Sequence, residues 1–206
     1  MDEMKALALV CTLTPSPEPS SSELLTSQVL DELKKLDVQT DLVRLVDHDI
    51  KPGVQRDMGP GDGWPSILQR VLDADILVLG TPVWVGHPSS IAQRLLERLD
   101  AEISETDERG NPSMSGKVAA AAIVGNEDGA HKITADLFQG LDDIGFTIPS
   151  QGVTYWVGEA MQGVDYKDLD GPPDPVAKTT ATVARNAVHV AKLLRDNPYP
   201  PPPGSE

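Results

Sequence analysis

Hydroxyl side chains crowd the loop at residues 12–22, TLTPSPEPSSS, which follows the first apolar run of the chain. Where such a loop enters a helix, the hydroxyls and the free N–H groups of the first helical turn can bind an anion. The loop lacks GxGxxG and GxxxxGK(S/T), the patterns of dinucleotide and triphosphate sites, so a phosphate monoester suits it better than a pyrophosphate. Residues 20–22 are also preferred helix N-caps, and capping alone is an alternative interpretation.

A tryptophan stands in the second such loop, which belongs to the segment DILVLGTPVWVGHPSS at residues 75–90. The apolar run over residues 76–79 ends in Gly80, and the chain then passes through Thr-Pro-Val-Trp-Val-Gly before a helical pattern begins. Trp84, held between Pro82 and Gly86, would offer a flat apolar surface to a flat ligand. The alternative is an ordinary core tryptophan in a loop.

The third loop, GNEDGAH at residues 125–131, again lies between an apolar run and a helical pattern. Its two glycines allow a close backbone approach, and Asn126 can donate and accept hydrogen bonds at once. Glu127 and Asp128 could form a catalytic carboxylate pair or bind a metal. The favoured interpretation is that these two residues have no chemical role, because acidic residues are common near a helix N-terminus.

These loops need a scaffold that brings them together, and the hydrophobic pattern predicts one. Strand-like runs alternate with amphipathic helical runs, which favours a parallel sheet with right-handed crossovers. The predicted strands cover residues 5–12, 38–46, 76–79, 117–125 and 147–155, and the predicted helices cover about 22–36, 65–73, 89–102, 130–144 and 176–195. Ligands of such sheets bind beyond the carboxyl ends of the strands, where all three loops would lie.

Composition limits the class of protein. The length of 206 residues fits one domain, predicted over residues 1–196, followed by a Pro-rich tail over 197–206. The net charge of −15 argues against nucleic-acid and anionic-membrane partners. The chain contains no apolar stretch long enough to span a bilayer, no signal-peptide pattern and only one cysteine, so we expect a cytoplasmic location.

Other chemically capable residues carry weaker signals. Cys11 ends a buried strand and is more simply a small core residue than a reactive thiol. Tyr155 and Trp156 follow the fifth predicted strand and could rim the same pocket or pack inside. No GxSxG hydrolase elbow is present, and the histidines lack metal-ligand spacing such as HExxH: His48, His87, His131 and His189. The sequence therefore predicts no metal site.

The three loops, in this order, resemble those of the flavodoxin-like NAD(P)H-dependent FMN reductase family. The resemblance extends from KALALVCTLTPSPEPSSSELL through DILVLGTPVWVGHPSS and GNEDGAHKI to ARNAVHVAKLLRDNP. It implies a flavodoxin-like three-layer α/β/α sandwich, with a five-stranded parallel sheet in the order 2-1-3-4-5 and FMN at the switch point. It also implies NADH or NADPH as co-substrate and a homodimer or homotetramer.

Carried over to this chain, the resemblance assigns the FMN phosphate to the first loop and the flavin ring to the other two. The phosphate candidates are Thr14, Ser16, Ser20, Ser21 and Ser22. The ring candidates are Pro82, Val83, Trp84, Val85, Gly86, Gly125, Asn126 and Gly129. Reductases of this family often carry Gly-Ser-Pro-Arg where Leu-Thr-Pro-Ser stands at residues 13–16 here, so the first loop lacks one positive charge.

The implied activity is hydride transfer from NAD(P)H to bound FMN and onward transfer of electrons to a flavin, a quinone or another small acceptor. The cofactor would carry this chemistry, so we assign no catalytic side chain. Two alternatives use the same fold. One is a flavodoxin-type electron carrier without NAD(P)H turnover, whose acidic surface would suit basic redox partners. The other is a cofactor-free interaction module.

Overall fold

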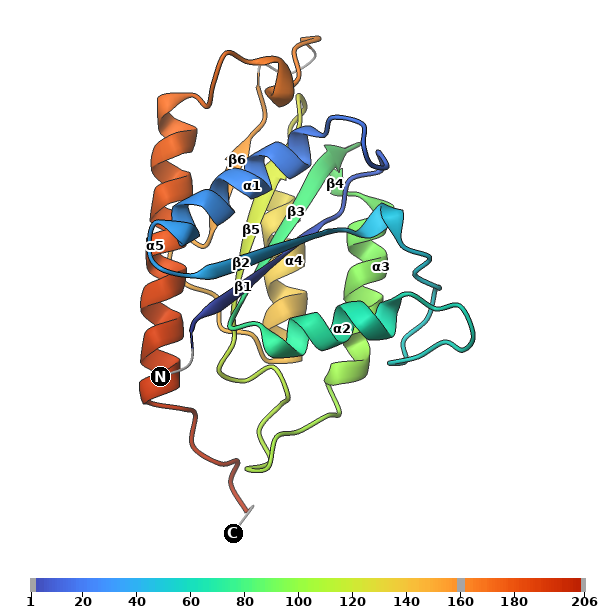
Figure 1. Cartoon of the computed structure of the whole chain (residues 1–206), viewed down its shortest axis with the longest axis vertical. Coiled ribbons are helices and arrows are strands. Elements are labelled where there is room, and N and C mark those ends of the chain that lie inside the picture. Colours follow the sequence, from blue (N-terminus) through green and yellow to red (C-terminus); the bar gives the residue numbers. More distant parts are fainter. Residues whose placement is uncertain (1–2, 159–161, 205–206) are drawn as a thin grey trace.

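The computed structural model describes residues 3–158 and 162–204. Five parallel strands form the sheet in the order β2-β1-β3-β5-β6 (Figure 1), which confirms the predicted order 2-1-3-4-5 counted along the parallel strands. A sixth, short strand pairs antiparallel with the end of β3. The strands are β1 (Lys5–Val10), β2 (Gln39–Arg44), β3 (Ile76–Trp84), β4 (His87–Pro88), β5 (Val118–Val124) and β6 (Val153–Trp156).

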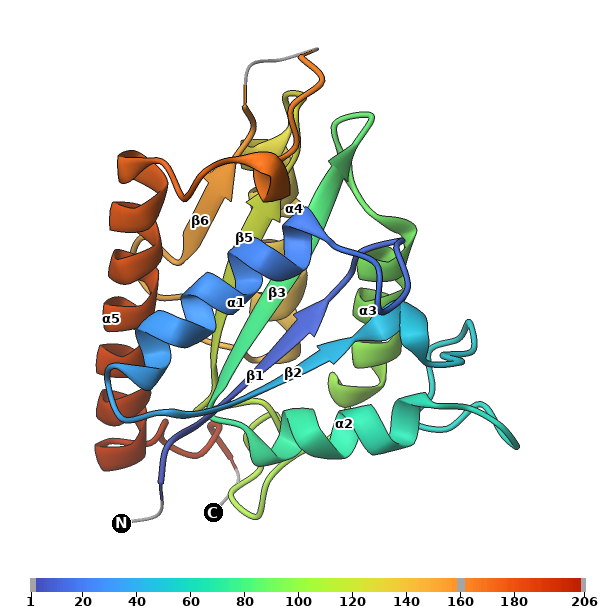
Figure 2. The same ribbon diagram turned by 45° about the horizontal axis from the view of Figure 1, so that its top comes forward.

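Helices cover both faces of the sheet, as predicted. One core joins α1 and α5 to residues such as Ala8 and Val78, and the other joins α2, α3 and α4 to residues such as Leu9 and Leu79. Figures 1 and 2 show α1 and α5 together on one side of the sheet. The helices are α1 (Ser21–Lys34), α2 (Trp64–Asp73), α3 (Ser90–Leu99), α4 (Ala130–Ile144) and α5 (Asp174–Asp196).

The end of β3 differs from the prediction, which closed this strand at Leu79. Gly80, Thr81 and Pro82 continue the parallel pairing with β5, and Val83 and Trp84 then pair with β4. A Gly-Thr-Pro sequence is typical of a loop, but the neighbouring strand extends far enough to hold it in the sheet. The second loop is thus shorter than predicted.

Helix α1 lies very close to β3. A methyl group added at Gly80 would fall 2.0 Å from Thr26 Oγ1, and this hydroxyl donates to the Ser22 carbonyl at 2.6 Å. Alanines fill the centre of β5, whose residues are all buried, so the helices can approach the sheet on both faces. The close approach at Gly80 determines where the first turn of α1 lies.

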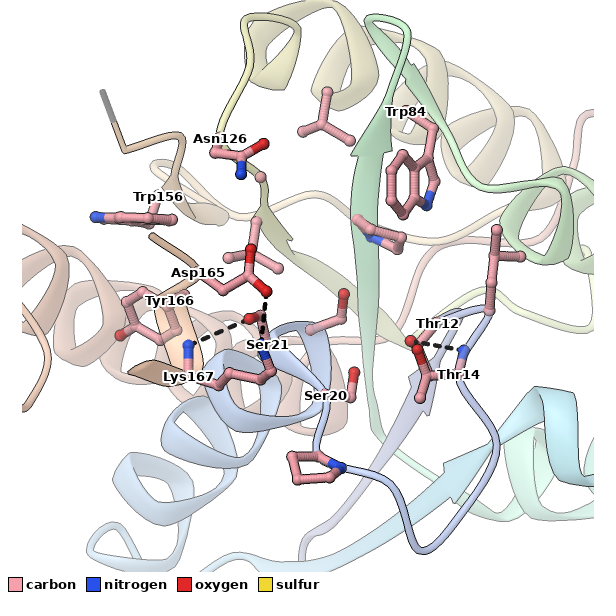
Figure 3. A pocket seen from close by; sticks show the side chains of 17 residues that line it. Thr12, Thr14, Ser20, Ser21, Trp84, Asn126, Trp156, Asp165, Tyr166 and Lys167 are labelled. Carbon is pink, nitrogen blue, oxygen red and sulfur yellow. Dashed lines mark hydrogen bonds and ion pairs between the residues drawn. The ribbon is translucent and has the colours of Figure 1, made fainter. Parts of the chain in front are cut away.

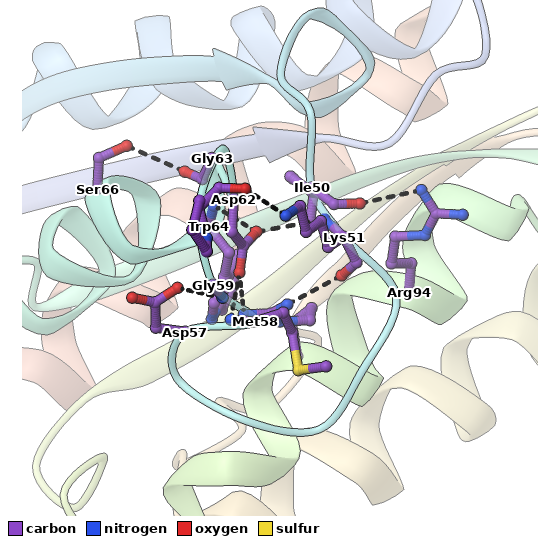
Figure 4. Close-up of polar contacts among 12 residues, drawn as sticks. Ile50, Lys51, Asp57, Met58, Gly59, Asp62, Gly63, Trp64, Ser66 and Arg94 are labelled. Atoms are coloured by element: carbon purple, nitrogen blue, oxygen red, sulfur yellow. Dashed lines mark hydrogen bonds and ion pairs between the residues drawn. The ribbon is translucent and has the colours of Figure 1, made fainter.

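A buried ion pair organises the polar connection between β2 and α2. The side chains of Asp62 and Arg98 are both fully buried, and they meet at 2.8 Å. The Asp62 carboxylate also accepts hydrogen bonds from backbone N–H groups, and Figure 4 shows them converging on it: those of Lys51, Met58 and Trp64. Arg98 donates in turn to the Lys51 carbonyl at 2.9 Å. This pair attaches the connection to α3.

The fifth predicted strand is wrong in its first half. Thr147 makes only an isolated bridge to Val118, and regular pairing starts at Val153. Beyond α5, the described part of the tail returns to this region, where the Tyr199 hydroxyl lies 2.9 Å from Thr147 Oγ1. The tail therefore lies at the amino ends of the strands.

In the described residues, no helix is both long and apolar enough to cross a membrane.

Candidate functional site

A pocket of about 330 Å³ opens at the carboxyl ends of β1, β3, β5 and β6 (Figure 3). The first two predicted loops and the start of the third contribute to it, as does a later segment around the short helix η3 (Tyr166–Asp168). Its described lining consists of Thr12, Leu13, Thr14, Pro19, Ser20, Ser21, Ser22, Pro82, Val83, Trp84, Val124, Gly125, Asn126, Trp156, Asp165, Tyr166 and Lys167.

The hydroxyl-rich loop is held from behind by the end of β2. The buried Arg44 guanidinium donates to the carbonyls of Thr14 and Glu18, at 3.2 and 2.9 Å, and pairs with Glu23 at 2.6 Å. An arginine is thus present, but it supports the loop backbone and is not part of the pocket lining. The sequence had no signal for this contact, because Arg44 comes from a separate strand.

Ser16, a predicted phosphate ligand, does not reach the pocket. Its hydroxyl donates to Asp47 Oδ2 at 2.6 Å, and its backbone N–H donates to Oδ1 at 2.8 Å. These two bonds from Ser16 hold the pKa of the Asp47 carboxyl below its usual value. The side chain of Ser16 therefore stabilises the loop and does not line the pocket, which corrects the predicted set of phosphate ligands.

The three serines at the start of α1 all line the pocket. Ser20 Oγ caps the helix by accepting the Glu23 N–H at 3.3 Å, so the capping interpretation is correct for Ser20 and coexists with its place in the lining. Ser21 and Ser22 occupy the first helical turn, where backbone N–H groups lack intrahelical acceptors. Thr12 and Thr14 add hydroxyls from the opposite side of the loop (Figure 3).

The second loop places an aromatic wall beside these hydroxyls. Trp84 lines the pocket and is 55% exposed, so it is not the core tryptophan of the alternative interpretation. Val85 and Gly86 do not line the pocket. They form a tight turn into β4, with φ angles of 53° and 70°. Glu127 Oε1 accepts the Val85 N–H at 2.8 Å, which gives this carboxylate a structural role.

The third loop contributes Gly125 and Asn126 to the lining, whereas Gly129 lies behind it. A methyl group at Gly129 would fall 2.8 Å from Gly86 Cα, and one at Gly125 would fall 2.8 Å from Val83 Cβ. Both glycines are therefore needed for the second and third loops to touch. Gly86 and Gly129 contribute to the packing behind the wall and not to its surface.

The segment after β6 was not predicted to reach the site. Trp156, which the sequence left open, lines the pocket, and the buried Tyr166 ring packs 5.4 Å from it. Tyr155 instead contacts His131, with Nε2 and the hydroxyl 3.0 Å apart. Nothing in the local sequence around Lys167 indicates proximity to residues nearly 150 positions earlier. Only the packing of this segment on α1 brings it to the pocket.

No side chain of the described lining is a histidine or cysteine, and no metal-binding cluster of His, Cys, Asp and Glu occurs among residues 3–158 and 162–204. Hydroxyls and a helix N-terminus suit a phosphate, and an apolar wall with tryptophans suits a planar ring. The lining therefore fits a flavin mononucleotide, which has a phosphate at one end and a planar ring at the other.

We predict that the Cys11 thiol is inert in the folded protein. It is fully buried, and burial raises its pKa far above that of a free thiol, so little reactive thiolate forms even at mildly alkaline pH. A thiol reagent should label less than one tenth of the chains under native conditions and all of them in denaturant. Rapid labelling of the folded chain would contradict the buried position.

Comparisons with known proteins agree with this geometry. A family model described as NADPH-dependent FMN reductase matches residues 4–162. The 8-demethyl-8-aminoriboflavin-5'-phosphate synthase of Streptomyces davaonensis is 30% identical over 95% of this chain and 80% of its own length. A crystal structure of RosB with the bound intermediate 8-demethyl-8-formylriboflavin-5'-phosphate superimposes with a TM-score of 0.88 at 30% identity, covering 95% of this chain and 82% of RosB.

A longer relative also matches. The protein named divalent metal cation transporter MntH in Mycobacterium bovis is 38% identical over 94% of this chain, but the chain spans only 29% of that protein. An archaeal flavodoxin superimposes with a TM-score of 0.59 at 11% identity, covering 92% of this chain and 99% of the flavodoxin. The flavodoxin shows the fold alone and confirms the predicted flavodoxin-like class.

Proposed function

This chain belongs to the NADPH-dependent FMN reductase family, and from that premise we propose that its pocket binds FMN and that it passes electrons from NADH or NADPH to a small acceptor. The observation that carries the proposal is the joining of two surfaces in one cavity. Serines at the N-terminus of α1 line the same cavity as Trp84 and Trp156, which stand on opposite sides of it (Figure 3). A phosphate at one end and a flat ring at the other is the shape of FMN.

In the proposed complex, each part of the lining has a distinct task. Thr14, Ser20, Ser21 and Ser22 bind the phosphate through hydroxyls and backbone N–H groups. Trp84 and Trp156 contact the ring, and the β3 and β5 ends enclose it with Pro82, Val83, Gly125 and Asn126. When bound, FMN supplies hydride acceptance and electron release. The half-exposed Trp84 leaves that side of the pocket open for a second small molecule.

A second candidate function treats a flavin phosphate as the substrate. The observation that favours it is the likeness to RosB, whose crystal structure contains a flavin phosphate intermediate. The same pocket would then bind FMN or a derivative reversibly and release it changed at the ring. A homodimer or homotetramer, which the family resemblance implies, remains a prediction under either function.

The first test is a visible spectrum of the purified chain with added FMN, followed by assays of NADH and NADPH oxidation. We expect flavin binding, and steady oxidation in the presence of a quinone or free flavin. Tight FMN binding without turnover would favour the electron carrier. Mass spectrometry showing chemically altered flavin would favour the second candidate. The absence of any flavin binding would refute both proposals and favour an interaction module.

Substitution of Trp84 tests the ring site. Trp84→Ala should weaken FMN binding by roughly 2- to 10-fold, since an aromatic contact contributes about 0.5–1.5 kcal/mol beyond area burial. The matched control is Tyr199→Ala, an exposed aromatic in the tail that should leave the dissociation constant unchanged. Flavin fluorescence titration measures both. Equal affinities in the two variants would place the ring elsewhere.

A further inference from the structure

The polar end of the pocket contains one basic side chain among its described lining residues, and it comes from the late segment. Lys167 is that residue, in a chain with a net charge of −15. The first loop, which lacks the arginine common in the family, supplies only hydroxyls and amides. A phosphate ester carries negative charge, so a cation at this end would add strongly to its binding.

Two contacts hold the segment of Lys167 on helix α1. The Lys167 backbone N–H donates to Ser21 Oγ at 3.2 Å, in the first turn of the helix. Two turns further along, the hydroxyl of the buried Tyr166 donates to Gln28 Oε1 at 2.6 Å. The position of Lys167 beside the α1 N-terminus is therefore built into the fold and does not depend on an exposed loop alone.

The ammonium group of Lys167 is shared between two carboxylates. Nζ lies 2.5 Å from Asp165, which lines the pocket, and 3.3 Å from Asp168, which does not. Figure 3 shows the Lys167 side chain beside Ser21 and near the Asp165 carboxylate. The hydrogen bond that Lys167 donates to Asp165 raises the pKa of Lys167, so the amine is charged at neutral pH.

We propose that Lys167 is the cation that selects the phosphorylated flavin and that Asp165 competes with the phosphate for it. This inference rests on the proposed binding of FMN. An ester phosphate near Ser21 would meet the ammonium group directly, while a flavin without phosphate would leave the Lys167–Asp165 pair undisturbed. Asp165 would also repel a ligand phosphate whose charge Lys167 does not neutralise. The affinity for a flavin should therefore depend on the charge of its phosphate end.

The test compares FMN with riboflavin, which lacks the phosphate, by fluorescence titration of the full chain. Lys167→Met should weaken FMN binding by about 10- to 100-fold, the range for a lost charge-assisted hydrogen bond, and change riboflavin binding less than 2-fold. Asp165→Asn should tighten FMN binding by about 3-fold or more, with less effect on riboflavin. Lys167→Arg should restore most of the FMN preference.

Lys34→Met is the matched control, because Lys34 also pairs with an aspartate at 2.9 Å but lies at the far end of α1. It should leave both affinities unchanged. If Lys167→Met weakens FMN and riboflavin equally, or neither, the assignment of Lys167 is refuted while the flavin pocket stands. If the unaltered chain binds neither flavin, the proposed function fails and this inference with it.

Discussion

Replacing Asp62 with Asn should lower the free energy of unfolding by about 3–5 kcal/mol, enough to threaten a domain whose total stability is about 5–15 kcal/mol. The substitution leaves the Arg98 guanidinium charged and fully buried without its partner at 2.8 Å. An uncompensated buried charge is costly because the interior solvates it poorly. Urea unfolding at neutral pH, followed by circular dichroism, measures the loss.

The same pair predicts the direction of the pH dependence. Burial by itself would raise the pKa of Asp62, but three backbone N–H donors and the Arg98 guanidinium outweigh it, so the pKa lies below its ordinary value. A carboxyl with a depressed folded-state pKa stabilises the protein above its unfolded pKa of about 4 and loses this contribution as the pH falls through the folded value. Asp62→Asn should flatten this part of the stability curve.

Two further variants separate the pair from general effects of charge. Asp31→Asn removes an exposed partner of Lys34 and should change the unfolding free energy by less than about 1 kcal/mol. Combining Asp62→Asn with Arg98→Met removes both buried charges, so the double variant should lose less stability than the sum of the single variants. A loss below about 1 kcal/mol for Asp62→Asn alone would contradict a buried, coupled pair.

Gly80→Ala should destabilise the protein by about 1–3 kcal/mol, the typical cost of excess volume in a packed core. The new methyl group would lie 2.0 Å from Thr26 Oγ1, so α1 or its threonine must move. Helix α1 carries the serines of the pocket at its first turn, so we expect weaker flavin binding as well. Thermal unfolding and FMN titration measure the two effects.

A double-variant cycle tests the cause. Thr26→Ala alone loses a buried hydrogen bond to the Ser22 carbonyl, at a cost of about 1 kcal/mol. In the double variant with Gly80→Ala, the hydroxyl that the new methyl group would meet is absent. The double variant should therefore lose less unfolding free energy than the sum of the two single variants. Gly140→Ala on α4 is the control, because its methyl group would meet Leu96 at an ordinary 3.5 Å. Strictly additive costs would contradict the steric explanation.

The sequence predicted the order of the elements well because each strand and helix carries its own hydrophobic period. It failed where an element depends on a distant neighbour. Thr81 and Pro82 belong to a strand because β5 runs alongside them. Thr147 lies outside β6 because regular pairing with β5 starts only at Val153. Local propensity contains neither fact.

The pocket shows the same division. Its three loops could be predicted because carboxyl ends of parallel strands meet at one edge, and most of the predicted residues do line one cavity. The sequence does not distinguish Ser16 from the neighbouring serines. In the fold, Ser16 donates its hydrogen bonds to Asp47, which is 31 residues away. Lys167 reaches the site through Ser21, at a separation of 146 residues, and no local pattern encodes such a contact.

The tail lies at the start of β5, where the Tyr199 hydroxyl contacts Thr147, while the pocket lies at the other end of that strand. Seven residues of β5 separate the two ends, which corresponds to roughly 20 Å. An affinity tag or an electrode linker joined after the tail would therefore anchor the molecule with its pocket facing the solution. Immobilised protein should remain open to dissolved reactants, but electrons exchanged with the support would have to cross the length of the sheet.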